Sequence, residues 1–414
     1  MSTISPLVQR FLSDLRVNFR GDIADNEASR LVFSTDNSIY QRIPQAIVFP
    51  KDIEDLQSIA KLAQQDTYQR IVLTARGGGT GTNGQSLTDG IIVDMSRHMN
   101  KIIAIDPEKR TAVVQSGVVK DQLNAALKEH GLFFAPELST SNRATIGGMI
   151  NTDASGQGSC RYGKTRHHVL GLKTVLLGGD ILDSSALNRQ SWQSDIQTKS
   201  AQQQSLYQSL FELATQNSEL IQKSFPELNR SLTGYDLPNL LTETQFDMNS
   251  VLCGSEGTLG FIAEATLNVL PIPKHQLLIN IGYTDFQAAL RDAKALMARD
   301  PLSIETVDAK VLGLAKQDIV WNNVAQYFPE TAEPIEGINL VEITSDDEAE
   351  LEQLKQAFIH HLETDTSVKR LSITTAAGRT AVNHVYAMRK RAVGLLGNVQ
   401  GEKRPQPFVE DTAV

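Results

Sequence analysis

The stretch Ala75–Gly84, ARGGGTGTNG, constrains the fold most, because it places five glycines directly after a predicted strand, Ile71–Ala75. Its part Gly79–Gly84 fits the pattern G-x-G-x-x-G of a dinucleotide-binding turn, in which a helix opens at the last glycines and holds the pyrophosphate. Only QSLTDG separates Gly84 from the next predicted strand, Ile91–Met95, so no helix fits between them. The sequence therefore argues against a Rossmann-type NAD site.

A second stretch, GSCRYGKT at Gly158–Thr165, fits the phosphate-binding pattern G-x-x-x-x-G-K-[ST]. A P-loop leaves a buried strand and enters a helix. Here the polar stretch NTDASGQ precedes the pattern, and RHHVLGL, which has no helical periodicity, follows it. We therefore disfavour a nucleoside-triphosphate site, for which ATP binding dependent on Lys164 would be the test. We interpret Arg161–Thr165 as a simple turn that carries basic surface side chains (basic decoration).

The run Arg76–Gly81 is open to another interpretation. It offers successive backbone N–H groups with little side-chain bulk, and such a nest can wrap a diphosphate without a helix or a cation. The alternative is a glycine-rich structural turn, although turns seldom need three consecutive glycines between Arg and Thr.

Composition limits the classes of function. The 414 residues predict two or three domains, and 41% hydrophobic with 21% charged residues is ordinary for a globular protein. The net charge of −9 predicts no nucleic-acid partner, and no apolar run approaches the ~20 residues of a transmembrane segment. The N-terminus lacks the pattern of a secretory signal, so we expect a cytoplasmic protein. Two cysteines, Cys160 and Cys253, predict free thiols and are too few for an iron–sulfur cluster.

Strand and helix patterns predict an α+β protein. We expect an amphipathic helix and a polar connector in the first ~40 residues. A helix capped by Asp52 should follow the first strand. Gln190–Ser209, rich in Gln and Ser, predicts an exposed excursion. The predicted strands are Gln45–Phe49, Ile71–Ala75, Ile91–Met95, Val251–Ser255 and Phe261–Leu270, with hairpins around Pro107–Arg110 and Gly178–Gly179.

The prolines Pro271 and Pro273 mark the preferred domain boundary. We expect an N-terminal helical segment at 1–42, a first domain at 43–273 and a second α+β domain at 274–414. The chain ends at FVEDTAV without a closing cap or a completed element, so we expect the last domain to be cut there.

Three separated motifs resemble a known family in order and spacing. RGGGTGTNG, APELSTSNRATIGGMINTDASG and CGSEGTLGFI, between about Ile43 and Pro273, resemble the FAD-binding domain of flavoproteins related to vanillyl-alcohol oxidase and p-cresol methylhydroxylase. The resemblance implies a two-subdomain FAD-binding domain followed by an incomplete substrate (cap) domain. SIETVDAKVLGLA, YAMRKRAVGLLGN and RPQPFVEDTAV are further similar to bacterial multidomain FAD-linked D-2-hydroxyglutarate dehydrogenases, in which an iron–sulfur half follows the flavin half.

The resemblance implies that FAD lies against small residues, which let the backbone approach a flat, bulky cofactor. Relatives often hold FAD covalently on a histidine of the glycine loop, and Thr80 stands at that place, so we predict non-covalent FAD. The implied FAD contacts are, in the diphosphate loop, Arg76, Gly77, Gly78, Gly79, Thr80, Gly81, Thr82 and Asn83; beside the isoalloxazine and ribityl chain, Pro136, Glu137, Leu138, Thr145, Ile146, Gly147 and Gly148; along the adjoining wall, Thr152, Ala154, Ser155 and Gly156; near the flavin, Tyr162 and Gly163; and on the adenine or ribityl side, Glu256, Gly257 and Ile262.

Arg389, in YAMRKR, is the substrate-binding residue that the resemblance implies, because a guanidinium binds a carboxylate bidentately. The alternative is a surface arginine in the basic cluster Arg389–Arg391. Lys390, Lys403 and Arg404 are weaker candidates.

The resemblance places a histidine-rich motif that binds a divalent metal beyond the equivalent of Val414, outside this chain. The eight histidines present include two adjacent pairs, His167–His168 and His360–His361. Adjacent side chains on a strand point apart and rarely chelate, so we expect solvated histidines and no metal site.

The activity implied by the resemblance is oxidation of a small-molecule D-2-hydroxy acid, with D-2-hydroxyglutarate giving 2-oxoglutarate. Hydride would pass from C2 to flavin N5 while a base, which the sequence does not identify, takes the hydroxyl proton. Electrons would continue to a downstream iron–sulfur domain or another acceptor outside this chain, and residues 1–414 alone should turn over weakly or not at all. The alternatives are D-lactate or glycolate as substrate, and a flavin electron-transfer module without a substrate of its own.

Overall fold

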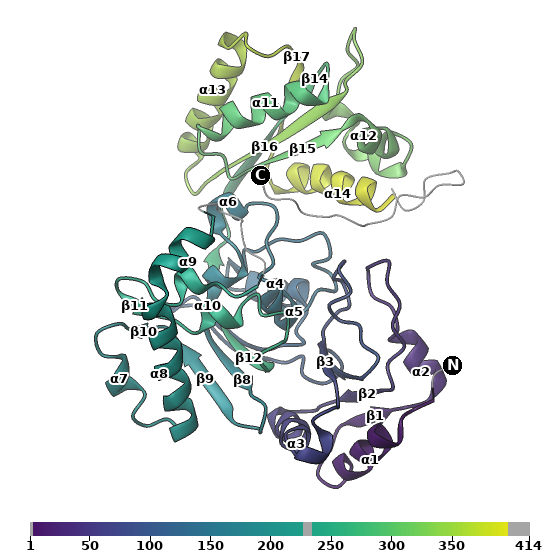
Figure 1. Ribbon diagram of the computed structural model, residues 1–414. Coiled ribbons are helices and arrows are strands. Elements are labelled where there is room, and N and C mark those ends of the chain that lie inside the picture. Colours follow the sequence, from purple (N-terminus) through teal and green to yellow (C-terminus); the bar gives the residue numbers. More distant parts are fainter. Residues whose placement is uncertain (1–2, 227–233, 396–414) are drawn as a thin grey trace. The chain divides into compact units, whose positions relative to one another are not determined.

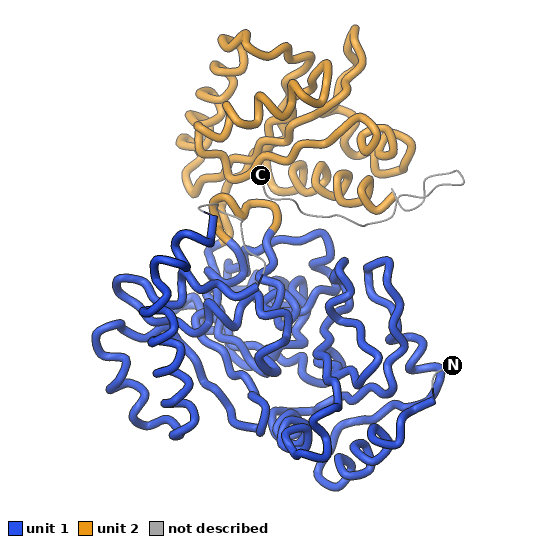
Figure 2. The backbone as a smooth tube through the Cα atoms, in the orientation of Figure 1, with its two compact units in different colours: residues 1–155, 164–271, 407–414 blue, residues 156–163, 272–406 orange. Residues whose placement is uncertain are grey.

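The computed structural model describes residues 3–226 and 234–395, which form two compact units (Figure 2). The described part of unit 1 comprises residues 3–155, 164–226 and 234–271. Unit 2 takes residues 272–395 together with the short segment 156–163. Among the described helices, none combines the length and the apolar character that a membrane span requires.

The first sheet of unit 1 carries the strand that enters the glycine loop. Its strands and neighbouring helices are β1 (Asp22–Ala24), β2 (Ala46–Phe49), β3 (Leu73–Arg76), β4 (Ile91–Asp94), α1 (Pro6–Leu15), α2 (Glu27–Val32), α3 (Ile53–Ala63) and η1 (Asp66–Tyr68). The order is β1-β2-β4-β3, with β2, β4 and β3 parallel and β1 antiparallel at one edge. Strands β1, β2 and β3 are labelled in Figure 1. Every residue of β2 and β4 is buried, as is usual for parallel strands covered on both faces.

The N-terminal helix and the cap of α3 are confirmed. Asp52 precedes α3 and its side chain accepts from the backbone N–H of Asp55. The predicted polar connector is more structured than expected. Its residues Asp22–Ala24 pair with β2, and Asn26 caps α2 through the N–H of Ser29.

The second sheet of unit 1 is antiparallel, in the order β5-β6-β12-β8-β9. Helices α4, α5, α8 and α10 contribute buried side chains to the core that this sheet shares. The predicted hairpins β5–β6 and β8–β9 are confirmed. The elements are β5 (Ile102–Asp106), β6 (Thr111–Gln115), β7 (Leu132–Phe133), β8 (Val169–Val175), β9 (Ile181–Ser185), β10 (Leu187–Asn188), β11 (Gln245–Phe246), β12 (Phe261–Asn268), β13 (Leu270–Pro271), α4 (Lys120–Lys128), α5 (Ile146–Asn151), α7 (Trp192–Asp195), α8 (Ala201–Gln216), α9 (Ser218–Ser224), α10 (Asn249–Leu252), η2 (Thr165–His168) and η3 (Leu237–Asn239).

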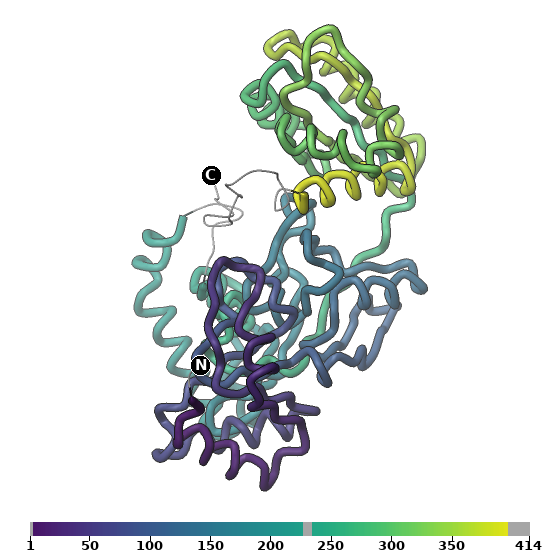
Figure 3. The backbone as a smooth tube through the Cα atoms, turned by 90° about the vertical axis from the view of Figure 1, so that its right-hand side faces the viewer, coloured from purple at the N-terminus to yellow at the C-terminus, as the bar shows by residue number. Residues whose placement is uncertain are grey.

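One prediction for unit 1 is incomplete and another is wrong. Most residues of Gln190–Ser209 are exposed, as predicted, but the stretch is also helical, with α7 and the start of α8, which Figure 3 draws in teal at the edge of unit 1. Trp192 and Tyr207 are buried there against the ring of Phe246. The stretch VLCGS is not a strand. Asn249–Leu252 form α10, since a short apolar run fits a buried helical turn as well as a strand.

Unit 2 is a β-α-β-β-α-β arrangement whose sheet has the order β15-β16-β14-β17, all antiparallel, as in ferredoxin-like folds. The predicted second α+β domain is therefore present in the described residues. Side chains alternate between two cores: Leu277 and Ile279 face α11 and α13, whereas Leu278 faces α12 and α14. The elements are α6 (Ser159–Tyr162), β14 (His275–Tyr283), α11 (Phe286–Met297), β15 (Ser303–Asp308), α12 (Ala309–Lys316), η4 (Ile319–Asn323), η5 (Ala325–Tyr327), β16 (Gly337–Ser345), α13 (Glu348–Thr364), β17 (Arg370–Ala377) and α14 (Arg379–Leu395).

Candidate functional site

The glycine loop connects β3 to β4 without a helix, which excludes a Rossmann turn. Within the described part of the chain, the backbone N–H groups of Gly77 to Thr82 donate no hydrogen bond, whereas that of Asn83 donates to Gln85. These residues are half-buried or exposed, and Gly79 has a φ of +61°. Successive N–H groups without an acceptor, in a loop that is half-buried or exposed, suit the oxygens of a diphosphate.

The loop packs directly on the start of α5, in the second motif. A Cβ on Gly77 would overlap Oγ1 of Thr145, and a Cβ on Gly78 would overlap the carbonyl oxygen of Arg143. Thr145 caps α5 through the N–H of Gly148 (3.3 Å). The glycines at 77 and 78 are therefore required by close backbone packing, and they join the first motif to the second.

The other end of α5 holds the third motif. The N–H of Gly254 donates to the carbonyl of Ile150 (2.8 Å), and that of Glu256 donates to the carbonyl of Asn151 (2.9 Å). The Asn151 side chain accepts from the N–H of Gly257 (3.0 Å) and donates to the carbonyl of Gly147 (2.8 Å). Glu256 has a φ of 53°, which is rare for a residue with a side chain. One short helix thus gathers all three motifs around itself.

Several implied FAD contacts have other partners in the structure. The Arg76 guanidinium leaves the loop and donates to the carbonyls of Phe33 (3.4 Å) and Thr35 (2.7 Å), and burial lowers its pKa. Arg76 therefore fixes the base of the loop. Glu137 forms an ion pair with the buried Lys120. Ile262 points its side chain into the core, which leaves only its backbone for a cofactor.

Gly156, Tyr162 and Gly163 belong to unit 2. Their predicted place beside the flavin is not tested by the geometry of unit 1 and stays a prediction.

The stretch that mimics a P-loop holds the wall Thr152–Ser155 in place. Lys164 is buried, and its Nζ lies 2.6 Å from Asp153 Oδ2. Thr165 donates to the carbonyl of Ala154 from both its N–H (3.0 Å) and its Oγ1 (2.6 Å). The 3₁₀ turn η2 and then β8 follow, instead of a long helix. The prediction of basic decoration is therefore wrong for Lys164, which neutralises a buried carboxylate, while the rejection of a P-loop is confirmed.

Arg166 also holds the segment Thr152–Ser155 in place. Its backbone N–H donates to Asp153 Oδ1 (3.0 Å), and its guanidinium forms an ion pair with the buried Asp236.

Both cysteines are free thiols, as predicted, and burial raises the pKa of Cys253 well above its ordinary value.

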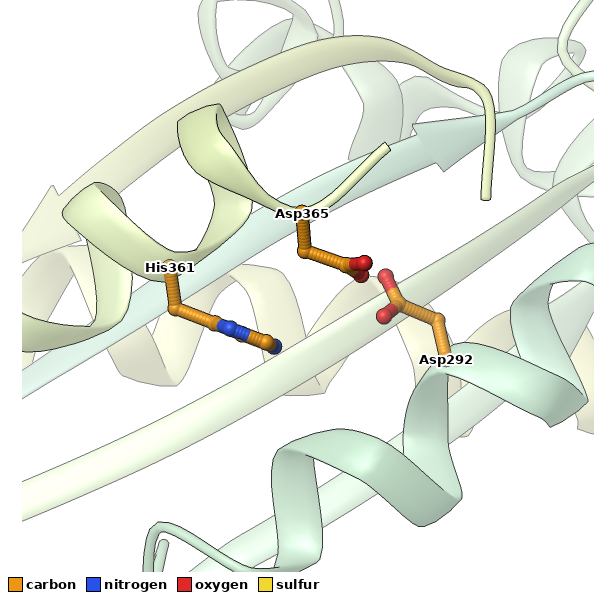
Figure 4. A group of neighbouring side chains, drawn as sticks. All are labelled: Asp292, His361 and Asp365. Atoms are coloured by element: carbon orange, nitrogen blue, oxygen red, sulfur yellow. The ribbon is translucent and has the colours of Figure 1, made fainter. Parts of the chain in front are cut away.

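The histidines are not all solvated, contrary to the prediction. His168 is buried, and His361 is half-buried on the helix α13 rather than on a strand. His361 lies with Asp292 and Asp365 in a group whose ligand atoms are all within 4.8 Å of one another (Figure 4).

A guanidinium already binds both carboxylates of this group. Arg370 Nη2 lies 2.6 Å from Asp292 Oδ1 and 2.8 Å from Asp365 Oδ2, and Arg370 Nε lies 2.7 Å from Asp292 Oδ2. A divalent cation beside this guanidinium would be repelled. The cluster is therefore best explained as a structural ion network.

Arg389, the implied substrate residue, lies on α14. Its Nη2 is 2.7 Å from Glu305 Oε2, and its side chain is 32% exposed. Lys390 follows it on the same helix, while Lys403 and Arg404 lie outside the described residues.

Comparisons with known proteins agree with this arrangement. Residues 44–185 match the FAD binding domain, and residues 272–414 match the C-terminal domain of FAD linked oxidases. The chain is 60% identical over 419 residues to a D-2-hydroxyglutarate dehydrogenase of Pseudomonas putida and 49% identical over 415 residues to that of Escherichia coli. These alignments cover 100% and 99% of this chain but 42% and 41% of the relatives, so the chain spans less than half of their length.

More distant relatives share parts of the chain or the fold. A glycolate oxidase subunit of Bacillus subtilis is 29% identical over 292 residues, which cover 70% of this chain and 51% of that protein. The crystal structure of an alkyldihydroxyacetonephosphate synthase matches with a TM-score of 0.66 at 17% identity, over 95% of this chain and 65% of that one, which shows a likeness of fold alone. The predicted α+β class and the resemblance in the FAD-binding domain are confirmed. The chain thus carries the FAD binding domain followed by the C-terminal domain of FAD linked oxidases.

Proposed function

We propose that this chain is the flavin-binding part of a dehydrogenase that oxidises D-2-hydroxyglutarate to 2-oxoglutarate. The observation that carries the proposal is the alignment along the whole chain, at 49–60% identity, with D-2-hydroxyglutarate dehydrogenases of several bacteria. The glycolate and D-lactate relatives align over 62–73% of this chain and at 27–29% identity. This contrast favours the dicarboxylic hydroxy acid.

The residues present fit FAD. The N–H groups of Gly77–Thr82, which donate to no acceptor among the described residues, would hold the diphosphate, and the segments that α5 gathers would line the rest of the cofactor. FAD, when bound, supplies the hydride acceptor for the oxidation. The chain's own contribution is to bind and orient: Arg76 fixes the loop, while Lys164 and Thr165 fix the wall.

Non-covalent FAD is the first expected result. The loop carries Thr80 where relatives often carry the histidine that forms the covalent link. The purified protein should show a flavin spectrum, and after acid precipitation the colour should stay in the supernatant. Colour in the pellet would contradict the role given to Thr80. A colourless protein that takes up no added FAD would contradict the flavin site itself.

Substrate recognition is proposed to use Arg389, which would anchor a carboxylate. The general base is not identified among the residues of this chain. We further propose that the divalent metal, the iron–sulfur cluster and the electron acceptor lie outside it, and that the protein is cytoplasmic. An electron-transfer module without a substrate of its own is the alternative, and it predicts no reduction of the flavin by any hydroxy acid.

A substrate panel tests the proposed specificity. At the full length of its curated relatives, the protein should be reduced by D-2-hydroxyglutarate, with kcat/KM for D-lactate and glycolate lower by at least about 10-fold, because a site built for two carboxylates is left with unpaired polar groups. Dye-linked assays give these values. Equal or higher kcat/KM for D-lactate or glycolate would replace the proposed substrate, and no reduction by any of the three would favour the electron-transfer module.

A further inference from the structure

The ion pair between Arg389 and Glu305 joins α14 to the sheet of unit 2. Glu305 lies on β15 two residues after Ser303, so both side chains leave the same face of the strand. Val307, on that face, belongs to the core shared with α12 and α14. Glu305 is therefore turned toward the helix that carries Arg389, and the pair connects a strand to a helix across a packed interface.

A second acid fixes the same helix one turn earlier. Glu342, on β16 opposite Ser303, is buried, and its Oε2 accepts from Tyr386 (2.7 Å), Gln157 (3.2 Å) and Ser303 (3.4 Å). Tyr386 precedes Arg389 by three residues, so the two share a side of α14.

Glu342 does not compete with Glu305 for the arginine. Its described partners are uncharged donors, and burial raises its pKa, with the nearby charge of Glu305 acting in the same direction. Glu305 is consequently the carboxylate that holds Arg389.

We propose that Glu305 is a positioning residue that presets Arg389 for a substrate carboxylate. A guanidinium has five N–H donors in a fixed fork. Glu305 pairs with Nη2, and the Arg389 side chain is 32% exposed, so the fork is not fully enclosed by the protein. Because Glu305 already restricts the Arg389 side chain, less conformational entropy of that side chain is lost when substrate binds. The proposal rests on the proposed function, in which Arg389 binds the substrate.

The test is a double-mutant cycle in the FAD-loaded protein at the full length of its curated relatives. Glu305→Ala should raise KM for D-2-hydroxyglutarate about 10-fold with kcat within about 2-fold, as expected for lost binding rather than lost chemistry. Glu305→Asp keeps the carboxylate charge of the ion pair and should restore part of the affinity. The double variant Glu305→Ala/Arg389→Ala should have the same KM as Arg389→Ala, because Glu305 acts through Arg389.

A matched control lies on the same helix. Arg391 Nε is 2.6 Å from Asp318 Oδ1, so Asp318→Ala also removes the acid partner of an α14 arginine and should leave KM unchanged. An unchanged KM in Glu305→Ala, or independent effects in the double variant, would overturn the positioning role alone. An unchanged KM in Arg389→Ala would overturn the substrate assignment of Arg389, and the positioning role with it.

Discussion

Replacing Arg370 by methionine is expected to lower the free energy of unfolding by about 3–5 kcal/mol, because it leaves a buried carboxylate without its cation. Arg370 binds both oxygens of Asp292, and the two side chains are only 5% and 0% exposed. Methionine fills a similar volume, so the loss is electrostatic rather than a cavity. Tyr283, which donates to Asp292 (2.6 Å), is too weak a partner to neutralise the charge. Urea denaturation of the chain measures the effect.

The neighbouring cation provides the control. Lys369 forms an ion pair with Glu333, but their side chains are 61% and 53% exposed. Lys369→Met should therefore change the free energy of unfolding by less than about 1 kcal/mol. If both substitutions cost equally little, the ion network is not structural. The group of Asp292, His361 and Asp365 would then have to be tested for metal binding by titration with Zn²⁺.

The ion network of Arg370 should also make the stability of the protein depend on pH. The hydrogen bond from Arg370 holds the pKa of Asp365 well below its usual range. A depressed pKa stabilises the folded state above the unfolded value of about 4, and this stabilisation is lost as the pH falls from there toward the folded pKa. The difference in stability between the original protein and Arg370→Met should accordingly shrink below pH ~4.

The local parts of the fold could be predicted from the sequence. The structure contains the predicted strand before the glycine loop and the predicted cap at Asp52, and β4 follows the loop with no helix between. Each of these features depends on residues close in sequence. The helix α8 could not be predicted in this way. Its polar, Gln-rich pattern is weak, and Tyr207 is buried by Phe246, almost 40 residues further along. This helix is stabilised by tertiary packing, which the local pattern of apolar residues does not reveal.

In the candidate site, too, the features set by local sequence could be predicted and those set by tertiary contacts could not. The three motifs were recognisable, but their convergence on α5 was not, because Asn151 binds Gly257 across 106 residues. Asn151 lies inside the second motif, and nothing in the neighbouring sequence marks it as the residue that binds the third motif. Likewise, the rejection of the P-loop pattern leaves Lys164 without a predicted role. Its structural role depends on the burial of Asp153, which the sequence does not display.

Gly78→Ala is expected to weaken FAD binding about 100-fold, because overpacking of a well-packed contact costs about 1–3 kcal/mol and this contact is made by backbone. The new methyl group would overlap the carbonyl oxygen of Arg143, which cannot rotate away as a side chain would. The loop must instead lift from the start of α5, and its N–H groups would lose the arrangement that suits a diphosphate. Titration of the apoprotein with FAD, followed by flavin fluorescence, measures the affinity.

The contrast within the loop is Gly81→Ala. The nearest atoms to a Cβ at Gly81 would be those of the Gln85 side-chain amide, with Cδ at 2.5 Å, and that flexible amide can move aside. The affinity for FAD should fall by no more than about 5-fold, since the displaced amide gives up the single hydrogen bond that its oxygen accepts from the N–H of Asn83. Equal losses in the two variants would mean that any added bulk in the loop blocks the cofactor. The packing of the loop on α5 would then not be what shapes the site.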